Sequence, residues 1–200
     1  MIRFFDILFS LLGIIILFPL FIIIYLLIII ESKGIGLYMQ NRVGKDGVDF
    51  ILYKFRSMHV GADKKGLLTI GGRDPRLTKV GTILRGLKLD ELPQLFNVLK
   101  GEMSLVGPRP EVRKYINLYT AEQLKVLQIR PGLTDYASIE YIDENEILSN
   151  ASDPEKTYIE KIMPHKIQLN MRYINNQGIK EYFSIIFLTL WLIKPQKQCF

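Results

Sequence analysis

The sequence predicts a mostly helical α+β domain that is attached to one N-terminal membrane helix. Residues 7–30 contain no charged side chain and consist mainly of Ile, Leu and Phe. Residues 37–43 and 48–55 have the composition of two strands, and residues 44–47 between them favour a turn, which predicts a small β-hairpin. Residues 92–99 place Leu and Phe at the spacing of one helix face.

The N-terminal apolar segment is long enough to cross a bilayer as a helix. Its 24 residues, 7–30, would reach about 36 Å, and a bilayer core is ~30 Å thick. Pro19 lies in the middle of the segment, where it removes a helix hydrogen bond and favours a kink or break. Arg3 and Lys33 place positive charge at both ends, so charge does not separate the two sides of the membrane. A re-entrant helix within residues 1–32, broken at Pro19, is therefore favoured modestly over a single-pass anchor.

A second apolar segment, residues 182–193, lies near the C-terminus and is too short to span a bilayer. Lys180 and Lys194 flank it, and Trp191 lies near its end. This pattern suits an amphipathic helix at the membrane interface, and it equally suits an ordinary core helix.

The formal net charge is +6, and the basic residues are spread along the chain instead of forming one basic run. With a membrane segment present, lipid headgroups and substrate phosphates are favoured as partners, and nucleic acid is not. Cys199 is the only cysteine, so no disulfide can form within the chain, and no role is assigned to it.

Local signals predict most of the remaining elements. Residues 61–76 have loop composition, and Thr78 is placed to cap a short helix. The helix over residues 92–99 should begin near Asp90, because Pro93 is tolerated only in a first turn. Two further helix starts and one kink are predicted at these positions: a capping box of Thr120 with Gln123, a start at Asp153-Pro154, and a kink at Pro164 in a helix that runs to about Asn176.

Asp90 and Glu91 are adjacent carboxylates at the start of the predicted helix. A helix N-terminus favours negative charge, so an Asp there should stay ionised, as a carboxylate nucleophile must. Such an Asp is also well placed to hold Mg²⁺ together with substrate phosphates. Taken alone, the two acidic residues are better explained as helix caps.

Basic residues around this acidic pair favour a phosphate-binding site. Arg109 lies in the stiff segment Gly107-Pro108-Arg109-Pro110, where each residue before a proline is restricted to extended conformations. Lys54 and Arg56 alternate along the second predicted strand, so both side chains can face one side, and Arg85 precedes Asp90 by five residues. Each of these cations alone is more simply a solvated surface charge.

Several chemistries are excluded. The sequence contains no P-loop motif and no nucleophile-elbow motif. His59 and His165 are the only histidines, and neither has the spacing of a metal site, so both are interpreted as structural or surface residues.

Five motifs then occur in the order of a known family: Lys54-Phe55-Arg56-Ser57-Met58, Leu84-Arg85, Leu89-Asp90-Glu91-Leu92-Pro93-Gln94-Leu95, Ser104-Leu105-Val106-Gly107-Pro108-Arg109-Pro110-Glu111, and Arg130-Pro131-Gly132-Leu133-Thr134. With them the chain resembles the bacterial sugar transferases, also called monotopic phosphoglycosyl transferases. The resemblance covers almost the whole chain.

The resemblance implies a fold and a location. A re-entrant helix broken at Pro19 would enter only the cytoplasmic leaflet of the bacterial inner membrane. Residues 33–200 would form a cytoplasmic catalytic domain that interfacial helices seat on membrane lipids. A homodimer is left open.

The resemblance also implies an activity. Asp90 would attack the β-phosphate of a UDP-sugar and release UMP, and polyprenyl (undecaprenyl) phosphate would then take up the sugar phosphate, as the first membrane step of surface glycan or glycoconjugate assembly. Mg²⁺ would be held at Asp90, and Glu91 would handle a proton or position its partners. Arg109 would bind phosphate, and Arg85 would support the acidic pair.

One segment departs from the family pattern. Many members follow Pro-Gly-[Ile/Leu]-Thr with Gly-Trp-Ala, whereas this chain has Asp135-Tyr136-Ala137. The donor sugar therefore cannot be read from the motifs. The alternative function is a catalytically inactive membrane-anchored scaffold or UDP-sugar-binding protein of the same fold.

Overall fold

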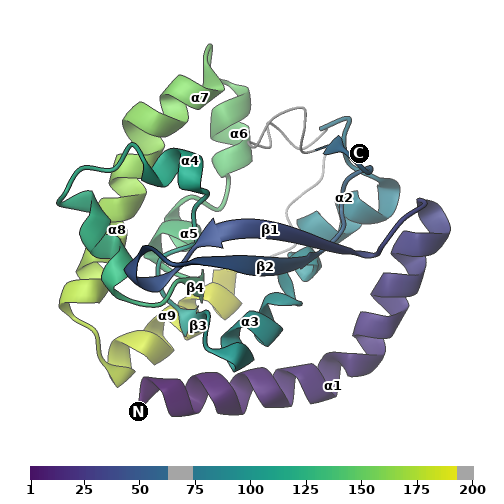
Figure 1. The fold of residues 1–200 in the computed structure, drawn as a ribbon, viewed down its shortest axis with the longest axis horizontal. Coiled ribbons are helices and arrows are strands. Elements are labelled where there is room, and N and C mark those ends of the chain that lie inside the picture. Colours follow the sequence, from purple (N-terminus) through teal and green to yellow (C-terminus); the bar gives the residue numbers. More distant parts are fainter. Residues whose placement is uncertain (63–73, 193–200) are drawn as a thin grey trace.

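The computed structural model describes residues 1–62 and 74–192. These residues are mostly helical, as predicted, and they form two small sheets where one hairpin was predicted (Figure 1). The remaining residues include most of the predicted loop 61–76, together with Lys194 and Cys199, so those predictions lie outside the described residues. The elements are α1 (Ile2–Glu31), β1 (Leu37–Val43), β2 (Asp49–Phe55), α2 (Lys79–Gly86), α3 (Gln94–Lys100), β3 (Ser104–Val106), α4 (Arg113–Ile116), β4 (Gly132–Thr134), α5 (Tyr136–Glu140), α6 (Glu144–Ser149), α7 (Pro154–Thr157), α8 (Met163–Asn175) and α9 (Ile179–Leu192).

Helix α1 runs without interruption through Pro19 and bends along its length (Figure 1). The predicted break is therefore not seen as an interruption of the helix, and re-entry into one leaflet stays a prediction. The helix is long and apolar enough to cross a membrane, and most of its side chains are exposed. Arg3 ties its first turn to the end of α3 by donating to the Val98 and Leu99 carbonyls at 2.6 and 2.9 Å.

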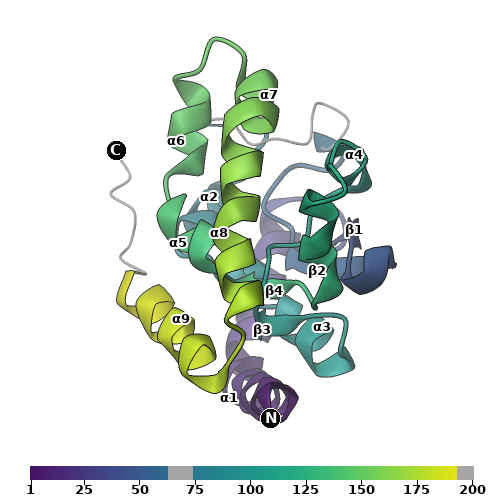
Figure 2. The ribbon, with the colours of Figure 1, turned by 90° about the vertical axis from the view of Figure 1, so that its left-hand side faces the viewer.

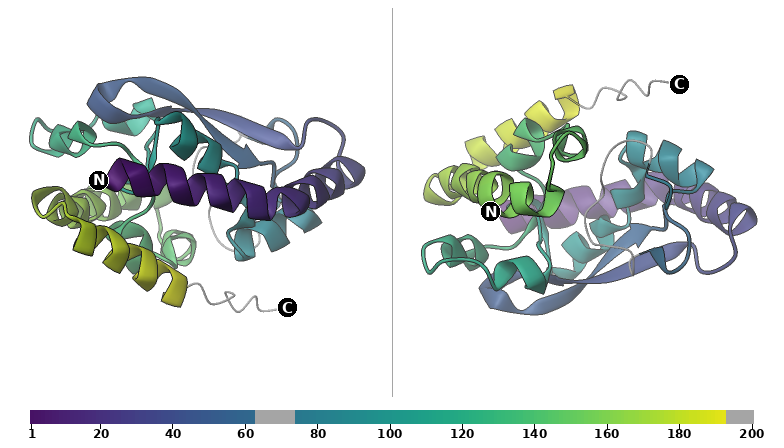
Figure 3. Two further views of the ribbon diagram at one scale, coloured as in Figure 1. Left: turned by 90° about the horizontal axis from the view of Figure 1, so that it is seen from below. Right: turned by 90° about the horizontal axis from the view of Figure 1, so that it is seen from above.

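Helix α9 lies on the same underside of the molecule as α1 (Figure 3). The rings of Phe5 and Phe183 join the two helices, with centroids 5.1 Å apart. Tyr182 is fully buried, whereas Phe187 and Trp191 are exposed. One face of α9 is thus core, as one of the two expectations for this segment had it. The other face presents exposed apolar side chains, and its place at a membrane interface stays a prediction.

The predicted hairpin is confirmed, with β2 starting at Asp49 instead of residue 48. Strands β1 and β2 pair antiparallel from Leu37 with Phe55 to Val43 with Asp49. Asp46 and Gly47 make the turn with φ of +56° and +76°, the left-handed region that Asp and Gly tolerate best.

Strands β3 and β4 form a short parallel pair that local sequence signals did not predict. Ser104 pairs with Gly132 and Val106 with Thr134. The residue after β3 approaches the start of β4 so closely that a Cβ on Gly132 would lie 2.1 Å from the Gly107 nitrogen. Glycine is required at this crossing, which fixes the start of the Gly107–Pro110 segment.

The predicted caps are confirmed. The Thr78 hydroxyl accepts from the Gly81 N–H at 2.9 Å, and Thr120 and Gln123 bond reciprocally at 2.9 and 3.3 Å. The Asp153 carboxylate accepts from the Lys156 N–H at 3.0 Å and starts the helical run that reaches Asn175. A π-helical turn, Tyr158–Ile162, precedes Pro164, where the kink was predicted.

The predicted start of the helix at Asp90 is wrong. Helix α3 begins at Gln94, and Asp90 lies in a separate 3-10 turn, Leu89–Glu91. Pro93 has no N–H to donate to the Leu89 carbonyl, so that carbonyl accepts from the Leu92 N–H instead, at 3.3 Å. The acidic pair therefore sits on a tight turn before the helix.

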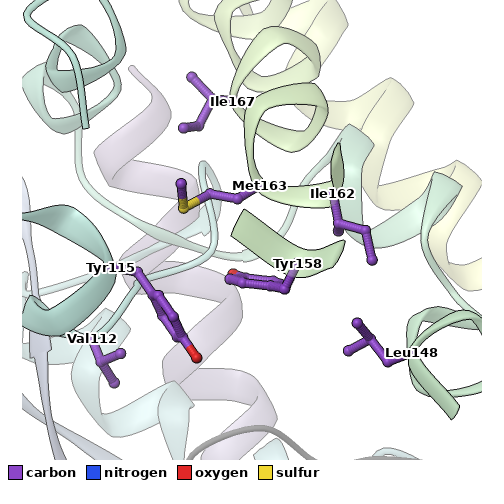
Figure 4. Packing of buried hydrophobic residues seen from close by; sticks show 7 residues of the cluster. All are labelled: Val112, Tyr115, Leu148, Tyr158, Ile162, Met163 and Ile167. Carbon is purple, nitrogen blue, oxygen red and sulfur yellow. The ribbon is translucent and has the colours of Figure 1, made fainter. Parts of the chain in front are cut away.

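A cluster of buried side chains joins α4, α6, the π-helical turn and α8 (Figure 4). The rings of Tyr115 and Tyr158 lie at its centre, with centroids 5.0 Å apart and planes tilted by 55°. This packing holds α8 beside the segment that follows β3, and so fixes one wall of the cavity described next.

Candidate active site

All six predicted site side chains line one open cavity of about 2300 Å³, although they come from four different parts of the chain. They are Lys54 of β2 and Arg56 directly after it, Arg85 of α2, Asp90 and Glu91 of the 3-10 turn, and Arg109 after β3.

Glu91 is held by two cations that come from different parts of the chain. The Lys54 ammonium lies 3.0 Å from Glu91 Oε1. The Arg109 guanidinium donates from Nη1 to Oε2 at 3.0 Å and from Nη2 to Oε1, which makes a forked pair. The Lys54 and Glu91 side chains are mostly buried, and that of Arg109 is 38% exposed, so one cation still faces the cavity.

The two carboxylates of the pair have opposite electrostatic surroundings. Burial raises the pKa of Asp90, and the neighbouring charge of Glu91 raises it further. Burial acts to raise the pKa of Glu91 as well, but Arg109 and Lys54 outweigh it and hold that pKa well below its usual range. Lys54, Arg85 and Arg109 act to lower the pKa of Asp90 without reversing the effect of burial.

The expectation that a helix N-terminus would favour an ionised Asp90 is thus opposite to the direction of the pKa shift. The physical reason is that Asp90 precedes the helix and is only 5% exposed, so desolvation of the carboxylate dominates. Phosphates and a cation entering the cavity would meet a carboxylate that is poorly solvated by water.

The segment that carries Arg109 is fixed on both sides. Its backbone N–H donates to Asp135 Oδ2 at 3.1 Å. Arg42 of β1 donates to the Pro110 carbonyl at 2.9 Å and to Glu111 Oε1 at 3.3 Å. Sequence analysis identified neither Arg42 nor Asp135 as a site residue. Asp135 lies in the segment where this chain departs from the family pattern. That departure was the one sequence signal that could have pointed to Asp135.

The other two predicted arginines are also engaged. Arg85 donates from Nε to Ser57 Oγ at 2.9 Å and acts on the charge of Asp90. Arg56 donates to the Ser32 and Lys33 carbonyls at 2.9 and 3.0 Å, just beyond the end of α1. It braces the membrane helix against the hairpin, and its role in phosphate binding stays a prediction.

Asp6 is a buried carboxylate that sequence analysis missed. Its Oδ1 accepts from Ser104 Oγ, the Leu105 N–H and the Tyr182 hydroxyl, each at 2.9 Å. Asp6 therefore joins α1 to β3 and α9. A lone acidic residue before an apolar run was the signal that could have found it.

The donor set fits Mg²⁺ only in combination with substrate phosphates. Among the described residues there is no group of three His, Cys, Asp or Glu side chains that could hold a metal ion. Mg²⁺ is commonly bound through one or two carboxylates plus phosphate oxygens and water. Asp90 can supply such a carboxylate, because the two cations engage Glu91 and the described residues donate no comparable hydrogen bond to Asp90.

The described part of the chain thus combines a helix long and apolar enough to cross a membrane with a cavity that holds an acidic pair among cations. The sequence model of the bacterial sugar transferase family matches residues 1–195, so the chain belongs to that family, as the motifs predicted.

Characterised relatives share much of the sequence. The chain is 37% identical over 188 residues to the UDP-N-acetylgalactosamine-undecaprenyl-phosphate N-acetylgalactosaminephosphotransferase of Aeromonas hydrophila, covering 92% of this chain and 41% of the relative. It is 44% and 34% identical to the UDP-glucose:undecaprenyl-phosphate glucose-1-phosphate transferases of Caulobacter vibrioides and Escherichia coli. The match to the Caulobacter vibrioides protein covers 60% of this chain and 46% of that relative, and the match to the Escherichia coli protein covers 93% of this chain and 38% of that relative. The chain thus spans less than half the length of each.

Proposed function

We propose that the protein transfers a sugar 1-phosphate from a UDP-sugar to undecaprenyl phosphate and releases UMP. The observation that carries the proposal is the unequal acidic pair: Glu91 is bound by two cations, whereas Asp90 is left facing the cavity. The names of the relatives supply the substrate classes, since each acts on undecaprenyl phosphate and transfers a sugar phosphate.

In the first step an oxygen of the Asp90 carboxylate attacks the β-phosphorus of the UDP-sugar. The bond from this phosphorus to the oxygen that bridges the two phosphates breaks, and UMP leaves with the electron pair. The sugar phosphate is then bound to Asp90 as an acyl phosphate. Burial of Asp90 favours this step, because a poorly hydrated carboxylate must shed little water before it attacks.

In the second step an oxygen of undecaprenyl phosphate attacks the phosphorus of the acyl phosphate. The bond between phosphorus and the Asp90 oxygen breaks, which restores the carboxylate and yields undecaprenyl-diphosphate-sugar. Neither step requires a proton to be removed from the nucleophile when both nucleophiles are ionised.

The cations position and neutralise the phosphates. Arg109 presents a rigid fork from a segment with little freedom, which suits phosphate oxygens. Lys54 and Arg85 add positive charge beside Asp90 and favour its ionised form. Glu91 acts as the anchor of Arg109 and Lys54, since its lowered pKa makes it a weak proton acceptor. Mg²⁺ held by Asp90 and the donor phosphates would supply further neutralisation of the phosphate charge.

The location follows from the two substrates. A nucleotide sugar is soluble and the acceptor is a lipid, so the cavity must lie at a membrane surface. We place the catalytic domain on the cytoplasmic face of the bacterial inner membrane, with α1 re-entering the bilayer and α9 at its interface. The product would be the first lipid-linked intermediate of a surface glycan or glycoconjugate.

The test is UMP release from a panel of UDP-sugars with Mg²⁺ and undecaprenyl phosphate, beginning with UDP-N-acetylgalactosamine and UDP-glucose. Asp90→Asn should abolish release and retain the melting temperature. Asp46→Asn is the matched control, because Asp46 is an exposed turn residue that does not line the cavity and should behave as wild type. If wild type binds UDP-sugars and releases no UMP with any donor, the inactive scaffold or binding protein is the better description.

A further inference from the structure

One wall of the cavity is a face of α8 that the proposed reaction leaves without a role. Met163, Lys166, Ile167 and Asn170 line the cavity at the spacing i, i+3, i+4 and i+7. We call these four residues the α8 wall. Figure 2 shows α8 continuing from α7 and lying beside α5 and α6, whose connecting residues line the same cavity.

Asn170 is the unusual residue of the α8 wall. It is 6% exposed, and within the described residues its Oδ1 has no hydrogen-bond partner. The fully buried Asn97 shows the ordinary arrangement: it accepts from the Tyr53 N–H at 3.0 Å and donates to the Ile51 carbonyl at 2.7 Å. Buried polar groups are nearly always paired, so this unpaired amide is a cost in the free protein that a hydrogen-bonding ligand would relieve. Oδ1 itself has almost no accessible surface, so a ligand would pair with it once the side chain turns toward the cavity.

The charges around Asn170 select the kind of ligand. Lys166, one turn before Asn170, is already paired with Glu144 at 2.7 Å. Asp143 and Glu146, close to Glu144 in the chain, also line the cavity. Carboxylates repel phosphate, so this part of the cavity suits a neutral group that carries hydrogen-bond donors and acceptors.

This wall is within electrostatic reach of the phosphate site. Glu144 is one of the charges that raise the pKa of Arg109, after Glu91 and Asp135. Glu144 also acts on Tyr158, whose hydroxyl bonds Glu111 next to the Arg109 segment. Arg109 and Asn170 line the same cavity, so a molecule whose diphosphate lies at Arg109 has open space in which to extend a neutral end toward the α8 wall.

We propose that the Asn170 amide recognises the neutral end of the UDP-sugar. A carboxamide offers an acceptor and a donor side by side, which matches the imide edge of uracil and equally matches a sugar hydroxyl or acetamido group. The inference rests on the proposed function, and it adds a substrate-recognition residue that the family motifs do not contain.

The test is Asn170→Leu, which keeps the approximate size of the side chain and removes the amide. Losing one neutral hydrogen bond should raise the KM for the UDP-sugar about three- to tenfold, with kcat little changed. Because Oδ1 is unpaired in the free protein, the melting temperature should stay the same or rise. Asn175→Leu is the matched control, since Asn175 is exposed on the same helix and does not line the cavity.

Thermal-shift titrations with UMP and with the UDP-sugar identify the recognised group. A weaker shift of Asn170→Leu with both ligands assigns the amide to uracil, and a weaker shift with the UDP-sugar alone assigns it to the sugar. An unchanged KM, together with unchanged shifts, would overturn the inference even when wild type releases UMP normally. A lowered melting temperature with unchanged KM would likewise overturn it, because the amide would then be structural. If wild type releases no UMP, the proposed function fails, and the two titrations alone decide the inference.

Discussion

Asp6 offers the sharpest test of how the membrane helix supports the site. Its carboxylate is 2% exposed and accepts three hydrogen bonds at one oxygen, from Ser104, Leu105 and Tyr182. Asp6→Leu removes the acceptor and leaves three buried donors. Asp6→Asn retains an acceptor oxygen and removes only the charge.

The expected loss of stability follows from the three donors. A buried donor without a partner costs about 1–3 kcal/mol, and the two hydroxyls can rotate toward other acceptors, so Asp6→Leu should destabilise by roughly 3–5 kcal/mol. Asp6→Asn should destabilise by about 1–2 kcal/mol, because charge-assisted hydrogen bonds are stronger than neutral ones. At roughly 2–4 °C per kcal/mol for a chain of this size, Asp6→Leu should lower the melting temperature by about 10 °C.

The assay is thermal unfolding of the protein in one detergent or nanodisc preparation, with kcat/KM for UMP release measured on the same samples. The exposed control Asp46→Asn should have the same melting temperature as wild type. Activity of Asp6→Leu should fall below that of wild type at temperatures where it is still folded, because β3 leads directly to the Arg109 segment. A melting temperature of Asp6→Leu within 2 °C of wild type, on the order of the scatter for surface substitutions, would refute the assigned role of this carboxylate.

Three further predictions concern the site and the helix. Arg109→Ala should lower kcat/KM about 10²–10³-fold, as expected for loss of a fixed donor at a charged transition state, and an unaltered kcat/KM would remove Arg109 from the site. The acid limb of the activity–pH profile should lie above the usual range of an Asp, because Asp90 must be ionised and its pKa is raised. Glu91→Gln removes the neighbouring charge and should move that limb to lower pH; a limb that stays in place would contradict this electrostatic account. Pro19→Ala restores a backbone N–H and should straighten α1, so that a cleavable N-terminal tag becomes accessible from the opposite side of membrane vesicles. Unchanged tag accessibility would show that Pro19 alone does not set the topology.

The parts of the fold that sequence predicted well are those that neighbouring residues determine. Thr78 and Asp153 cap helices through bonds to residues three positions away, and the hairpin turn depends on Asp46 and Gly47. Motif order identified the family, which the match over residues 1–195 confirms. These signals do not depend on how distant segments pack.

The parts that sequence missed depend on distant contacts and on burial. The pairing of Ser104 with Gly132 follows from a close approach of backbones that no local pattern encodes. The raised pKa of Asp90 follows from burial, which the position before a helix did not indicate. Arg56 directly follows β2 and lines the same cavity as Lys54, but its guanidinium is bound to carbonyls beyond α1, because the end of that helix packs there.

The covalent role of Asp90 is the central claim, and intact-protein mass spectrometry tests it most directly. Wild type is mixed with the UDP-sugar and Mg²⁺ in the absence of undecaprenyl phosphate, and then the acceptor is added. The account predicts that one sugar phosphate is added per chain, that Asp90→Asn shows no addition, and that the acceptor removes the added mass. Turnover by wild type without any added mass, or an adduct that persists in Asp90→Asn, would contradict it.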